Sequence, residues 1–368
     1  MSDRRPRLHL VHGPTPLVRR QALDEIVGAN VWVKRDDMTG GPEAGNKLRK
    51  LEFLLADAVE KRAMTVITCG GLQSNHARAT ALACAQLGLR SILFLRVPDP
   101  AAARKSSLDL VGNVLLDRLA GAEIRFISPD EYRERNAIME KARAELALNG
   151  EAAYIVPEGG SNGIGALGYV EAMRETKQQV DLGLADATAT SHTGRGRSPE
   201  APRFDVVAHA CGSGGTAAGV ALGAAYHGVA REAWAFAVCD DSAYFTKIIA
   251  RITIELRGLD PSLPEVAFVE PGSGDAVAPD GAARLVVDDR AKGPAYASMS
   301  DEQKQFLVRV ARATGLVFDP VYTGKALFGV ARAVARGDIR RDANVLFLHT
   351  GGLPGLLAQG EELRRAIG

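Results

Sequence analysis

The sequence predicts an α/β protein in which mostly parallel strands alternate with helices. Short apolar runs, such as residues 65–68 (TVIT) and 91–95 (SILFL), are separated by longer stretches with helical periodicity. Continuous apolar runs are typical of strands buried on both faces, which occur in parallel sheets with helical crossovers. The length of 368 residues exceeds one typical core, so we expect two domains or one large unit with a lobe.

The first half of the chain contains most of this alternation. The pattern predicts strands at residues 30–34, 65–68, 91–95, 123–127 and 153–156. It predicts helices at residues 47–62 and 75–87. The first of these helices is amphipathic, because one of its faces collects the apolar side chains of Leu51, Leu54, Leu55 and Ala58.

The second half continues the alternation with one interruption. It predicts a helix at residues 168–180 and another from the loop near residue 212 to about residue 226. It predicts strands at residues 204–208, 234–238 and 344–348. Residues 181–203 are polar and rich in Gly, Ser, Thr and Ala, so we interpret them as a mobile surface insertion.

The composition argues against several classes of partner. Apolar residues make up 46% and charged residues 24%, as in an ordinary soluble enzyme, and the net charge of +1 gives no electrostatic reason to expect nucleic acid or an anionic membrane. The apolar runs are shorter than the ~20 residues needed to cross a bilayer. Residues 1–7 are charged and lack the apolar core of a secretory signal, which favours a cytoplasmic location.

The cysteines and histidines show no metal-binding or disulfide pattern. No CxxC spacing relates the four cysteines, which fit buried free thiols in a reducing cytosol: Cys69, Cys84, Cys211 and Cys239. The seven histidines contain no HExxH or similar ligand pattern. We therefore expect no catalytic metal.

Lys47 stands in a turn, residues 45–50 (GNKLRK), that opens the first predicted helix. One interpretation is a solvated surface charge. In the other, partial burial and the neighbouring cations Arg49 and Lys50 lower the pKa of the ammonium group. A neutral amine of this kind can form a Schiff base.

A glycine-rich loop follows the strand at residues 204–208 and opens a helix. Backbone N–H groups without bulky side chains at a helix N-terminus bind a phosphate dianion, and nearby hydroxyl groups add further donors. The loop that offers both consists of Gly212, Ser213, Gly214, Gly215 and Thr216. A reactive amine and a phosphate loop together are what pyridoxal 5'-phosphate requires. The loop also matches a loose dinucleotide pattern with Asp240 after the next strand, so a Rossmann-type NAD(P) oxidoreductase is the alternative.

Polar residues also follow other predicted segments. Residues 73–76 (QSNH) open a helix, where Ser74 or Asn75 either caps the helix or helps bind a substrate carboxylate. Residues 158–163 (EGGSNG) are interpreted as a hinge or packing turn. Three residues with hydroxyl side chains follow apolar segments near the C-terminus: Tyr296, Tyr322 and Thr350. Their hydroxyl groups either form structural hydrogen bonds or bind a ligand at the end of the sheet.

Together these segments resemble the D-cysteine desulfhydrase and 1-aminocyclopropane-1-carboxylate deaminase family, within the tryptophan-synthase-β-like pyridoxal phosphate enzymes of fold type II. The resemblance runs from residues 14–17 (PTPL) to residues 349–352 (HTGG). It implies two open, mostly parallel twisted sheets with flanking helices. It also implies a large cofactor-binding domain (residues 1–52 and 166–368), a small mobile domain (residues 53–165) that closes over the substrate, and a homodimer.

The resemblance also implies roles for individual residues. Lys47 would bind the cofactor covalently and then act as general base, while Asn75 would hydrogen-bond the cofactor's 3′-oxygen. The loop at residues 212–216 would hold the phosphate, and Thr350 would meet the pyridine nitrogen. The substrate would be lined by Ser74, Asn75, His76, Tyr296, Tyr322 and Thr323, of which Ser74, Tyr296 and Tyr322 join Lys47 as the catalytic set.

Two residues favour one branch of this family. His76 and Thr323 resemble the residues of the desulfhydrases. The deaminases are similar to one another in having Gln at the position of His76 and Glu at the position of Thr323. We therefore expect a lyase that converts D-cysteine to pyruvate, hydrogen sulfide and ammonia by α,β-elimination. The alternatives are an L-cysteate sulfo-lyase, a 1-aminocyclopropane-1-carboxylate deaminase and a non-catalytic relative that binds metabolites. The chain departs from the family pattern at residues 41–44 (GPEA), at residues 181–203 and at Cys211.

Overall fold

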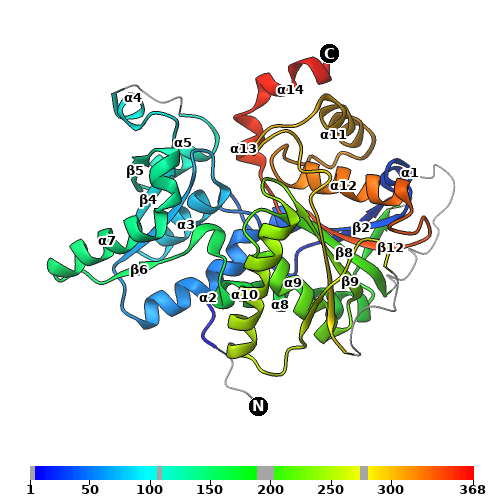
Figure 1. Cartoon of the computed structure of the whole chain (residues 1–368), viewed down its shortest axis with the longest axis horizontal. Helices are drawn as coiled ribbons and strands as arrows, with labels where there is room; N and C mark the ends of the chain where they lie inside the picture. The colour runs from blue at the N-terminus through cyan, green and yellow to red at the C-terminus, as the bar shows by residue number, and fades with distance from the viewer. Residues whose placement is uncertain (1–4, 106–109, 189–202, 274–280) are drawn as a thin grey trace.

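The computed structural model describes residues 5–105, 110–188, 203–273 and 281–368. Its strands form two separate sheets, and helices pack on both faces of each (Figure 1). This arrangement confirms the predicted α/β class with two open, mostly parallel sheets.

The larger sheet has eight strands, and all neighbouring strands run parallel except β1 and β2. The order is β10 (Val266–Phe268), β11 (Ala283–Asp288), β9 (Ala230–Ala237), β8 (Phe204–Cys211), β12 (Asn344–Leu348), β2 (Asn30–Lys34), β1 (Leu17–Arg20) and β7 (Asp186–Thr188). At the centre, Leu346 pairs with Trp32 on one side and Val207 on the other. The carboxyl ends of β2, β8 and β12 therefore lie at one edge of the sheet.

The smaller sheet consists of four parallel strands in the order β5 (Glu123–Ile127), β4 (Arg90–Arg96), β3 (Thr65–Gly71) and β6 (Ala153–Ile155). Successive residues of β4 point to opposite faces. Phe94 joins the core cluster under α7 (Arg135–Leu148), whereas Leu93 and Leu95 join the cluster under α3 (Asn75–Gln86). Burial on both faces explains why this strand reads as a continuous apolar run.

Two hydrophobic clusters cover the two faces of the larger sheet. One contains Val220 and Ile252 and lies under α8 (Gly163–Asp181), α9 (Gly215–His227) and α10 (Ser242–Leu259). The other contains Val310 and Val330 and lies under α1 (Gln21–Val27), α11 (Asp301–Thr314) and α12 (Thr323–Arg336). The strands between these layers are held rigidly, which gives fixed positions to the residues that follow them.

Helix α2 (Asn46–Glu60) connects the two sheets. Its apolar face, including Leu51 and Leu54, packs on Val66 of β3, and its other side contacts α8 of the larger unit. A Cβ on Gly168 of α8 would lie 2.1 Å from the carbonyl oxygen of Arg49, so only glycine allows this approach. Since α2 runs unbroken through residue 53, the domain boundaries expected at residues 53 and 165 stay a prediction.

Several elements differ in extent from those that the sequence predicts. Helix α8 begins at Gly163, five residues before the expected start, because the side chain of Asn162 accepts a hydrogen bond from the Gly165 N–H (2.9 Å) and caps the helix. Strands β10 and β11 and the first residues of β9 were not predicted. Within residues 181–203, interpreted as a mobile insertion, Asp186–Thr188 instead form β7 beside β1; residues 189–202 lie outside the described residues.

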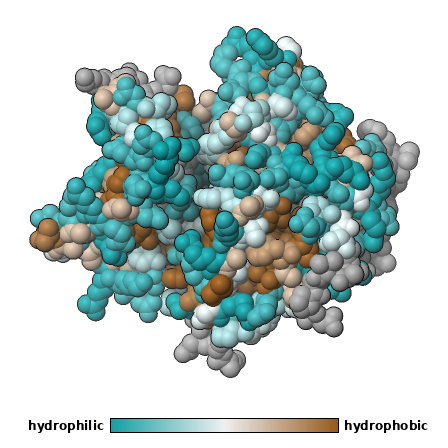
Figure 2. Space-filling view, viewed as in Figure 1, coloured by the Kyte–Doolittle hydropathy of each residue, from teal (hydrophilic) through white to brown (hydrophobic). Residues whose placement is uncertain are grey.

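A notch separates the part of the molecule that is built on the smaller sheet from the remainder (Figure 2). Hydrophilic side chains cover much of this face of the molecule on both sides of the notch. In the ranges that the structure describes, no helix combines the length and the apolar character that a membrane span requires.

Candidate active site

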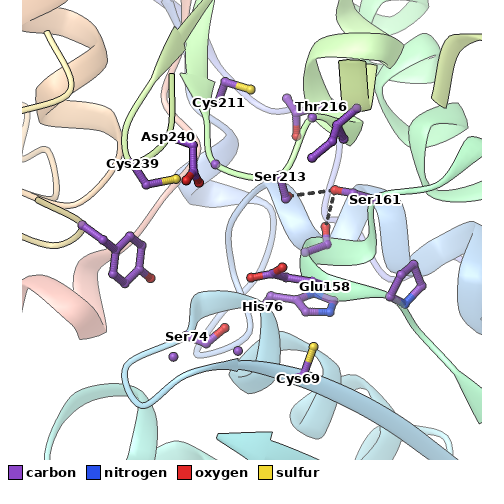
Figure 3. A pocket seen from close by; sticks show the side chains of 18 of the residues that line it. Cys69, Ser74, His76, Glu158, Ser161, Cys211, Ser213, Thr216, Cys239 and Asp240 are labelled. Carbon is purple, nitrogen blue, oxygen red and sulfur yellow. Dashed lines mark hydrogen bonds between the residues drawn. The ribbon is translucent and has the colours of Figure 1, made fainter. Parts of the chain in front are cut away.

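A cavity of about 520 Å³ lies where strands of both sheets end. Its wall is formed by residues that follow β3, β6, β8, β9 and β12, together with the start of α2. Figure 3 shows its two sides, on which Cys69, Ser74 and His76 face Ser161, Ser213 and Thr216. The carboxyl ends of parallel strands are the usual position for ligands in α/β proteins.

Most of the predicted site residues share this cavity. Its wall includes Lys47, Ser74, Asn75, His76, Gly212, Ser213, Gly214, Thr216, Tyr296, Tyr322 and Thr350. Gly215 does not line it, because its N–H donates to Ser161 Oγ (3.2 Å) behind the loop. Thr323 does not line it either, since its buried hydroxyl donates to the carboxylate of Asp319 (2.5 Å).

Lys47 is the second residue of α2 and reaches the cavity because the chain turns sharply before it. Gly45 has a φ of 127°, and a Cβ there would lie 3.0 Å from the Thr350 carbonyl oxygen. That carbonyl accepts a hydrogen bond from the Asn46 N–H (3.1 Å). The turn is thereby tied to the residue that follows β12.

Burial lowers the pKa of Lys47 to about 8, although the charges of Glu158 and Cys211 oppose the shift. The side chain is partly exposed where it lines the cavity. The contributions expected of Arg49 and Lys50 are both absent among these causes. The Arg49 guanidinium binds Asp36 instead (Nη2 to Oδ1, 2.8 Å). Lys47 therefore has a substantial neutral fraction near pH 8.

The loop at residues 212–214 and the start of α9 form a concave surface of backbone amides. Gly214 has a φ of 83°, and no side chain caps the helix that follows. A Cβ on Gly215 would lie 2.8 Å from both Lys50 Nζ and Ser161 Oγ. This close approach leaves a small cradle of backbone N–H donors that fits a phosphate group.

Lys50 adds a second buried amine to this side of the cavity. Its Nζ donates to the Gly159 carbonyl (2.9 Å) and to Ser161 Oγ (3.1 Å). Burial, and secondarily the charge of Lys47, hold the pKa of Lys50 well below its usual value. Ser161 Oγ in turn lies 2.8 Å from Ser213 Oγ.

The turn at residues 158–163, interpreted as a hinge or packing turn, also contributes to the cavity wall. Glu158, Gly159 and Ser161 line the wall beside the glycine loop. Glu158 Oε1 accepts a hydrogen bond from the Tyr132 hydroxyl (2.5 Å), and its other oxygen pairs with Arg135 (2.9 Å). Nothing in the local sequence distinguishes this turn from other glycine turns.

The capping interpretation of residues 73–76 is confirmed at the start of α3, while binding of a substrate carboxylate stays a prediction. Ser74 Oγ accepts a hydrogen bond from the Ala77 N–H (3.2 Å) and caps the helix, and Ser74 also lines the cavity. Asn75 Oδ1 accepts from the Nδ2 of Asn113 (3.0 Å), which also donates to the Gln73 carbonyl (2.9 Å). Asn113 is fully buried and fixes the amide of Asn75 with its NH₂ group free to serve the cavity.

His76 is neutral and held in one orientation. Its Nε2 lies 2.8 Å from Thr68 Oγ1, whose own proton goes to the Val156 carbonyl (2.8 Å). The hydroxyl therefore accepts from an Nε2–H. Burial, followed by the charges of Lys47 and Lys50, keeps the pKa of His76 well below its usual value.

Two tyrosines form the opposite part of the wall. The hydroxyls of Tyr296 and Tyr322 lie 2.8 Å apart, with the rings edge to face. Burial raises the pKa of both phenols, so both are protonated at neutral pH. A Cβ on Gly212 would lie 2.9 Å from the Tyr322 ring, which places this tyrosine against the phosphate-type loop.

Arg78 of α3 fixes the segment before Lys47, where the sequence departs from the family pattern. Its guanidinium donates to the carbonyls of Pro42 and Ala44 (2.8 Å for Ala44). Asp117, of α5 (Gly112–Leu119), lies near Arg78, and neither of its carboxylate oxygens has a hydrogen-bond partner among the described residues. Burial raises the pKa of Asp117 to about 7 despite the charge of Arg78.

Asp117→Asn is expected to flatten the decline of stability between pH 5 and pH 8. A carboxyl whose pKa is raised from 3.8 to about 7 stabilises the fold fully below pH 3.8 and loses that contribution as the pH rises through 7. Between pH 5 and pH 8 the loss is at most roughly 3 kcal/mol, because only the two units below pH 7 contribute, at about 1.4 kcal/mol each. Urea midpoints of both proteins at the two pH values measure it; parallel declines would contradict the expectation. The exposed Asp130→Asn serves as control.

Comparison with known proteins identifies the family. A family model described as "Pyridoxal-phosphate dependent enzyme" matches residues 8–351. The chain belongs to this family. Pyridoxal phosphate is therefore its cofactor, in place of the dinucleotide alternative, and the cradle at residues 212–216 and the amine of Lys47 fit its phosphate and aldehyde.

Relatives of similar length narrow the family. A bifunctional D-cysteine desulfhydrase/1-aminocyclopropane-1-carboxylate deaminase of Arabidopsis thaliana, described as mitochondrial, is 38% identical over 98% of this chain and 81% of its own. A putative 1-aminocyclopropane-1-carboxylate deaminase of Thermotoga maritima is 39% identical over 97% and 99%. This pyridoxal phosphate enzyme thus belongs to the deaminase and desulfhydrase group.

Solved structures agree with this placement. The crystal structure of an ACC deaminase homologue superposes with a TM-score of 0.79 at 32% identity and covers 99% of this chain and 97% of its own. A fungal L-serine ammonia-lyase from Rhizomucor miehei has a TM-score of 0.62 at 17% identity, over 96% and 98% of the two chains. The second likeness shows the shared fold only.

Proposed function

We propose that this enzyme catalyses α,β-elimination from a small amino acid, with D-cysteine as the first candidate substrate. The products would be pyruvate, ammonia and hydrogen sulfide, after addition of one water. The observation that carries the proposal is one cavity that joins a lysine amine of pKa about 8 to two protonated tyrosines, Tyr296 and Tyr322. The name of the Arabidopsis relative, which includes D-cysteine desulfhydrase, supports the substrate.

The residues on the cavity wall would divide the work as follows. Bound pyridoxal phosphate supplies a conjugated electron sink for charge that develops at Cα. Lys47 would hold the cofactor through its aldehyde and would take the Cα proton of the substrate. The NH₂ group of Asn75, oriented by Asn113, donates to the cofactor's 3′-oxygen. Ser74 Oγ and neighbouring amides take the substrate carboxylate.

Thr350 would tune the cofactor. Its hydroxyl, in place of a carboxylate, would leave the pyridine nitrogen of a bound cofactor less protonated. The cofactor is then a milder electron sink, which favours prompt departure of the β-substituent. Thr350 lines the cavity at the end of β12, where its backbone is fixed by the Asn46 N–H.

His76 and Thr323 would favour the desulfhydrase branch in different ways. His76 lines the cavity and would contact the substrate with a neutral ring. Thr323 is bonded to Asp319, whose Oδ2 accepts from the Tyr322 N–H (2.8 Å), so Thr323 would act through the position of Tyr322.

A comparison of three substrates tests the proposal. D-cysteine is expected to give pyruvate and sulfide with the highest kcat/KM. L-cysteate would instead release sulfite, and 1-aminocyclopropane-1-carboxylate would give 2-oxobutanoate and ammonia, so each reaction has its own product assay. Turnover of the cyclopropane substrate without any turnover of D-cysteine would overturn the assignment.

We further propose that the enzyme is a cytoplasmic homodimer and that residues 53–165 form a small domain that closes over the bound substrate. The cavity lies between residues of both sheets, so a relative movement of the sheets would change its access. Sedimentation of the holoenzyme checks the dimer.

A further inference from the structure

The cavity wall carries more positive than negative charge. Its basic side chains are Arg96, Arg133, Arg135 and Arg251, besides Lys47, whereas its acidic side chains are Glu158 and Asp240. The cofactor's phosphate would be held elsewhere, by the loop at residues 212–216. The arginines therefore need another explanation.

Three of these arginines have carboxylate partners. Arg135 pairs with Glu158 (2.9 Å), and Arg133 pairs with Asp130 (2.7 Å). Arg251 lies 3.7 Å from Glu255 on its own helix. Arg96 differs, because among the residues that the structure describes no carboxylate lies within ion-pair distance of its guanidinium.

Arg96 is nevertheless held in place. Its guanidinium carbon lies 4.9 Å from the centre of the Tyr132 ring and 5.6 Å from the centre of the Tyr296 ring. Contacts of this kind attract a cation without neutralising it. The planar group is therefore oriented by two rings while its N–H donors stay free for a ligand.

The position of Arg96 is on the substrate side of the cavity. It is the last residue of β4 and pairs in register with Gly71, which precedes the turn to Ser74. A Cβ on Gly71 would lie 3.6 Å from the Tyr296 ring. From Arg96, the wall runs through Tyr296 and Tyr322 to the glycine loop, so Arg96 lies at the end remote from the phosphate cradle.

We propose that Arg96 binds a negatively charged β-substituent of the substrate, so that the enzyme acts on amino acids with an anionic sulfur group, a thiolate or a sulfonate. This inference rests on the proposed elimination. In that reaction the Cα–H bond breaks and Lys47 takes the proton, while the Cβ–S bond breaks and its electron pair leaves with sulfur. A sulfonate leaves as sulfite. A thiolate takes a proton from the Tyr296 hydroxyl, which water then replaces, and leaves as hydrosulfide. Arg96 donates hydrogen bonds to the departing anion in either case.

Arg96→Gln is expected to discriminate between substrates by side-chain charge. The variant should lower kcat/KM for cysteate and cysteine at least 10-fold, and for β-chloroalanine, whose side chain is neutral, less than 3-fold. Each substrate is used as the enantiomer that the wild type prefers. The cysteate and cysteine arms show whether a sulfonate or a thiolate is the better ligand. Equal losses for all three would place Arg96 at the substrate carboxylate and overturn the proposal.

A binding measurement separates this inference from the proposed function. Calorimetry of the holoenzyme with 3-sulfopropanoate, compared with butanoate, should show tighter binding of the sulfonate in the wild type and the loss of that preference in Arg96→Gln. Arg133→Gln removes an equal charge from an exposed, paired arginine and should keep the preference. If no amino acid is turned over, the elimination fails while this test still stands; an unchanged preference in Arg96→Gln would refute the role of Arg96. Unchanged melting temperature and cofactor absorbance show that the variant is folded.

Discussion

Lys47→Ala is expected to remove covalent binding of pyridoxal phosphate and to lower kcat/KM for elimination by at least roughly 10³-fold. Lys47 lies just after the turn at Gly45 and lines the cavity. Burial lowers the pKa of its amine to about 8. The phosphate cradle is unchanged in the variant, so the cofactor can still bind without a covalent bond. Mass spectrometry after borohydride reduction measures the attachment, and a pyruvate assay measures the rate.

The control for this experiment is Lys61→Ala. Lys61 lies just after the same helix, is largely exposed and pairs with Asp57 (2.7 Å). It should retain both the borohydride-stable adduct and the activity. A stable cofactor adduct in Lys47→Ala at another lysine, Lys50 above all, would contradict the assignment.

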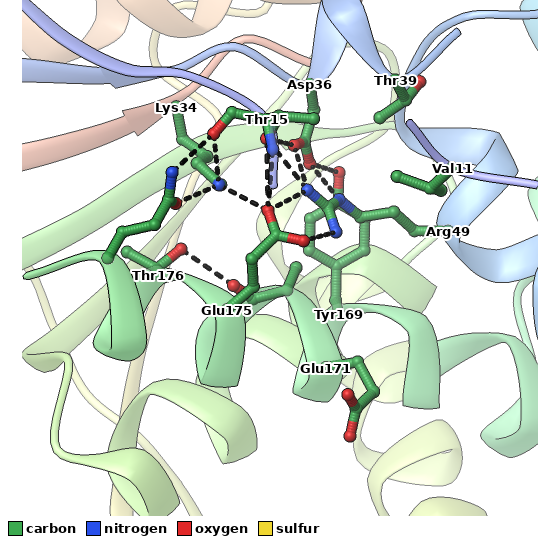
Figure 4. Close-up of polar contacts among 12 residues, drawn as sticks. Val11, Thr15, Lys34, Asp36, Thr39, Arg49, Tyr169, Glu171, Glu175 and Thr176 are labelled. Atoms are coloured by element: carbon green, nitrogen blue, oxygen red, sulfur yellow. Dashed lines mark hydrogen bonds and ion pairs between the residues drawn. The ribbon is translucent and has the colours of Figure 1, made fainter. Parts of the chain in front are cut away.

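Arg49→Met is expected to destabilise the fold by about 3–5 kcal/mol, because it leaves a buried carboxylate without its counter-charge. Asp36 is fully buried and accepts hydrogen bonds from Arg49 Nε (2.9 Å) and from the Tyr169 hydroxyl (2.8 Å) (Figure 4). Arg49 also pairs with Glu175 (2.9 Å), which binds Lys34 Nζ as well (2.6 Å). Urea unfolding at pH 7 measures the loss.

The pH dependence of this network has the opposite sign to that of Asp117. Burial alone would raise the pKa of Glu175, but Arg49 and Lys34 outweigh it and lower the pKa to about 2. Its stabilisation is present above the ordinary pKa of 4.5 and is lost as the pH falls towards 2.

A surface pair provides the comparison. Arg174→Met breaks an ion pair with Glu171 (2.8 Å) that is partly exposed on the same helix as Glu175, and should cost less than about 1 kcal/mol. The double variant Asp36→Asn, Arg49→Met should recover part of the stability that Arg49→Met loses. Equal effects of Arg49→Met and Arg174→Met would show that the buried network contributes no more than a surface pair.

The sequence predicts those parts of the site in which one local pattern carries the chemistry. The glycine loop after β8 and the residues that open α3 follow apolar strands directly, so their place at a strand end can be inferred. The position of Lys47 can be inferred from the glycine turn at Gly45 alone. Gly215 and Thr323 stand in the same patterns but point away from the cavity, since Ser161 and Asp319 occupy their hydrogen-bonding groups.

The remaining site residues depend on contacts between segments that are far apart in the chain. Asn113 reaches Asn75 from α5, and Arg96 meets Tyr296 across 200 residues of sequence. Ser161 acquires its role from Lys50 and Ser213. No periodicity or spacing reports such pairings, because each is created by the packing of helices onto the two sheets.

Two lysines at the start of α2, Lys47 and Lys50, affect the stability of the protein before the cofactor binds. Lys47 and Lys50 repel each other in a region of low polarity, and one stays charged only at a cost to the folded state. Pyridoxal phosphate held by the glycine loop and by the amine of Lys47 would relieve both effects. Newly made chains should therefore be more prone to unfolding and proteolysis than loaded ones, so that the cellular level of the enzyme follows the supply of its vitamin-derived coenzyme.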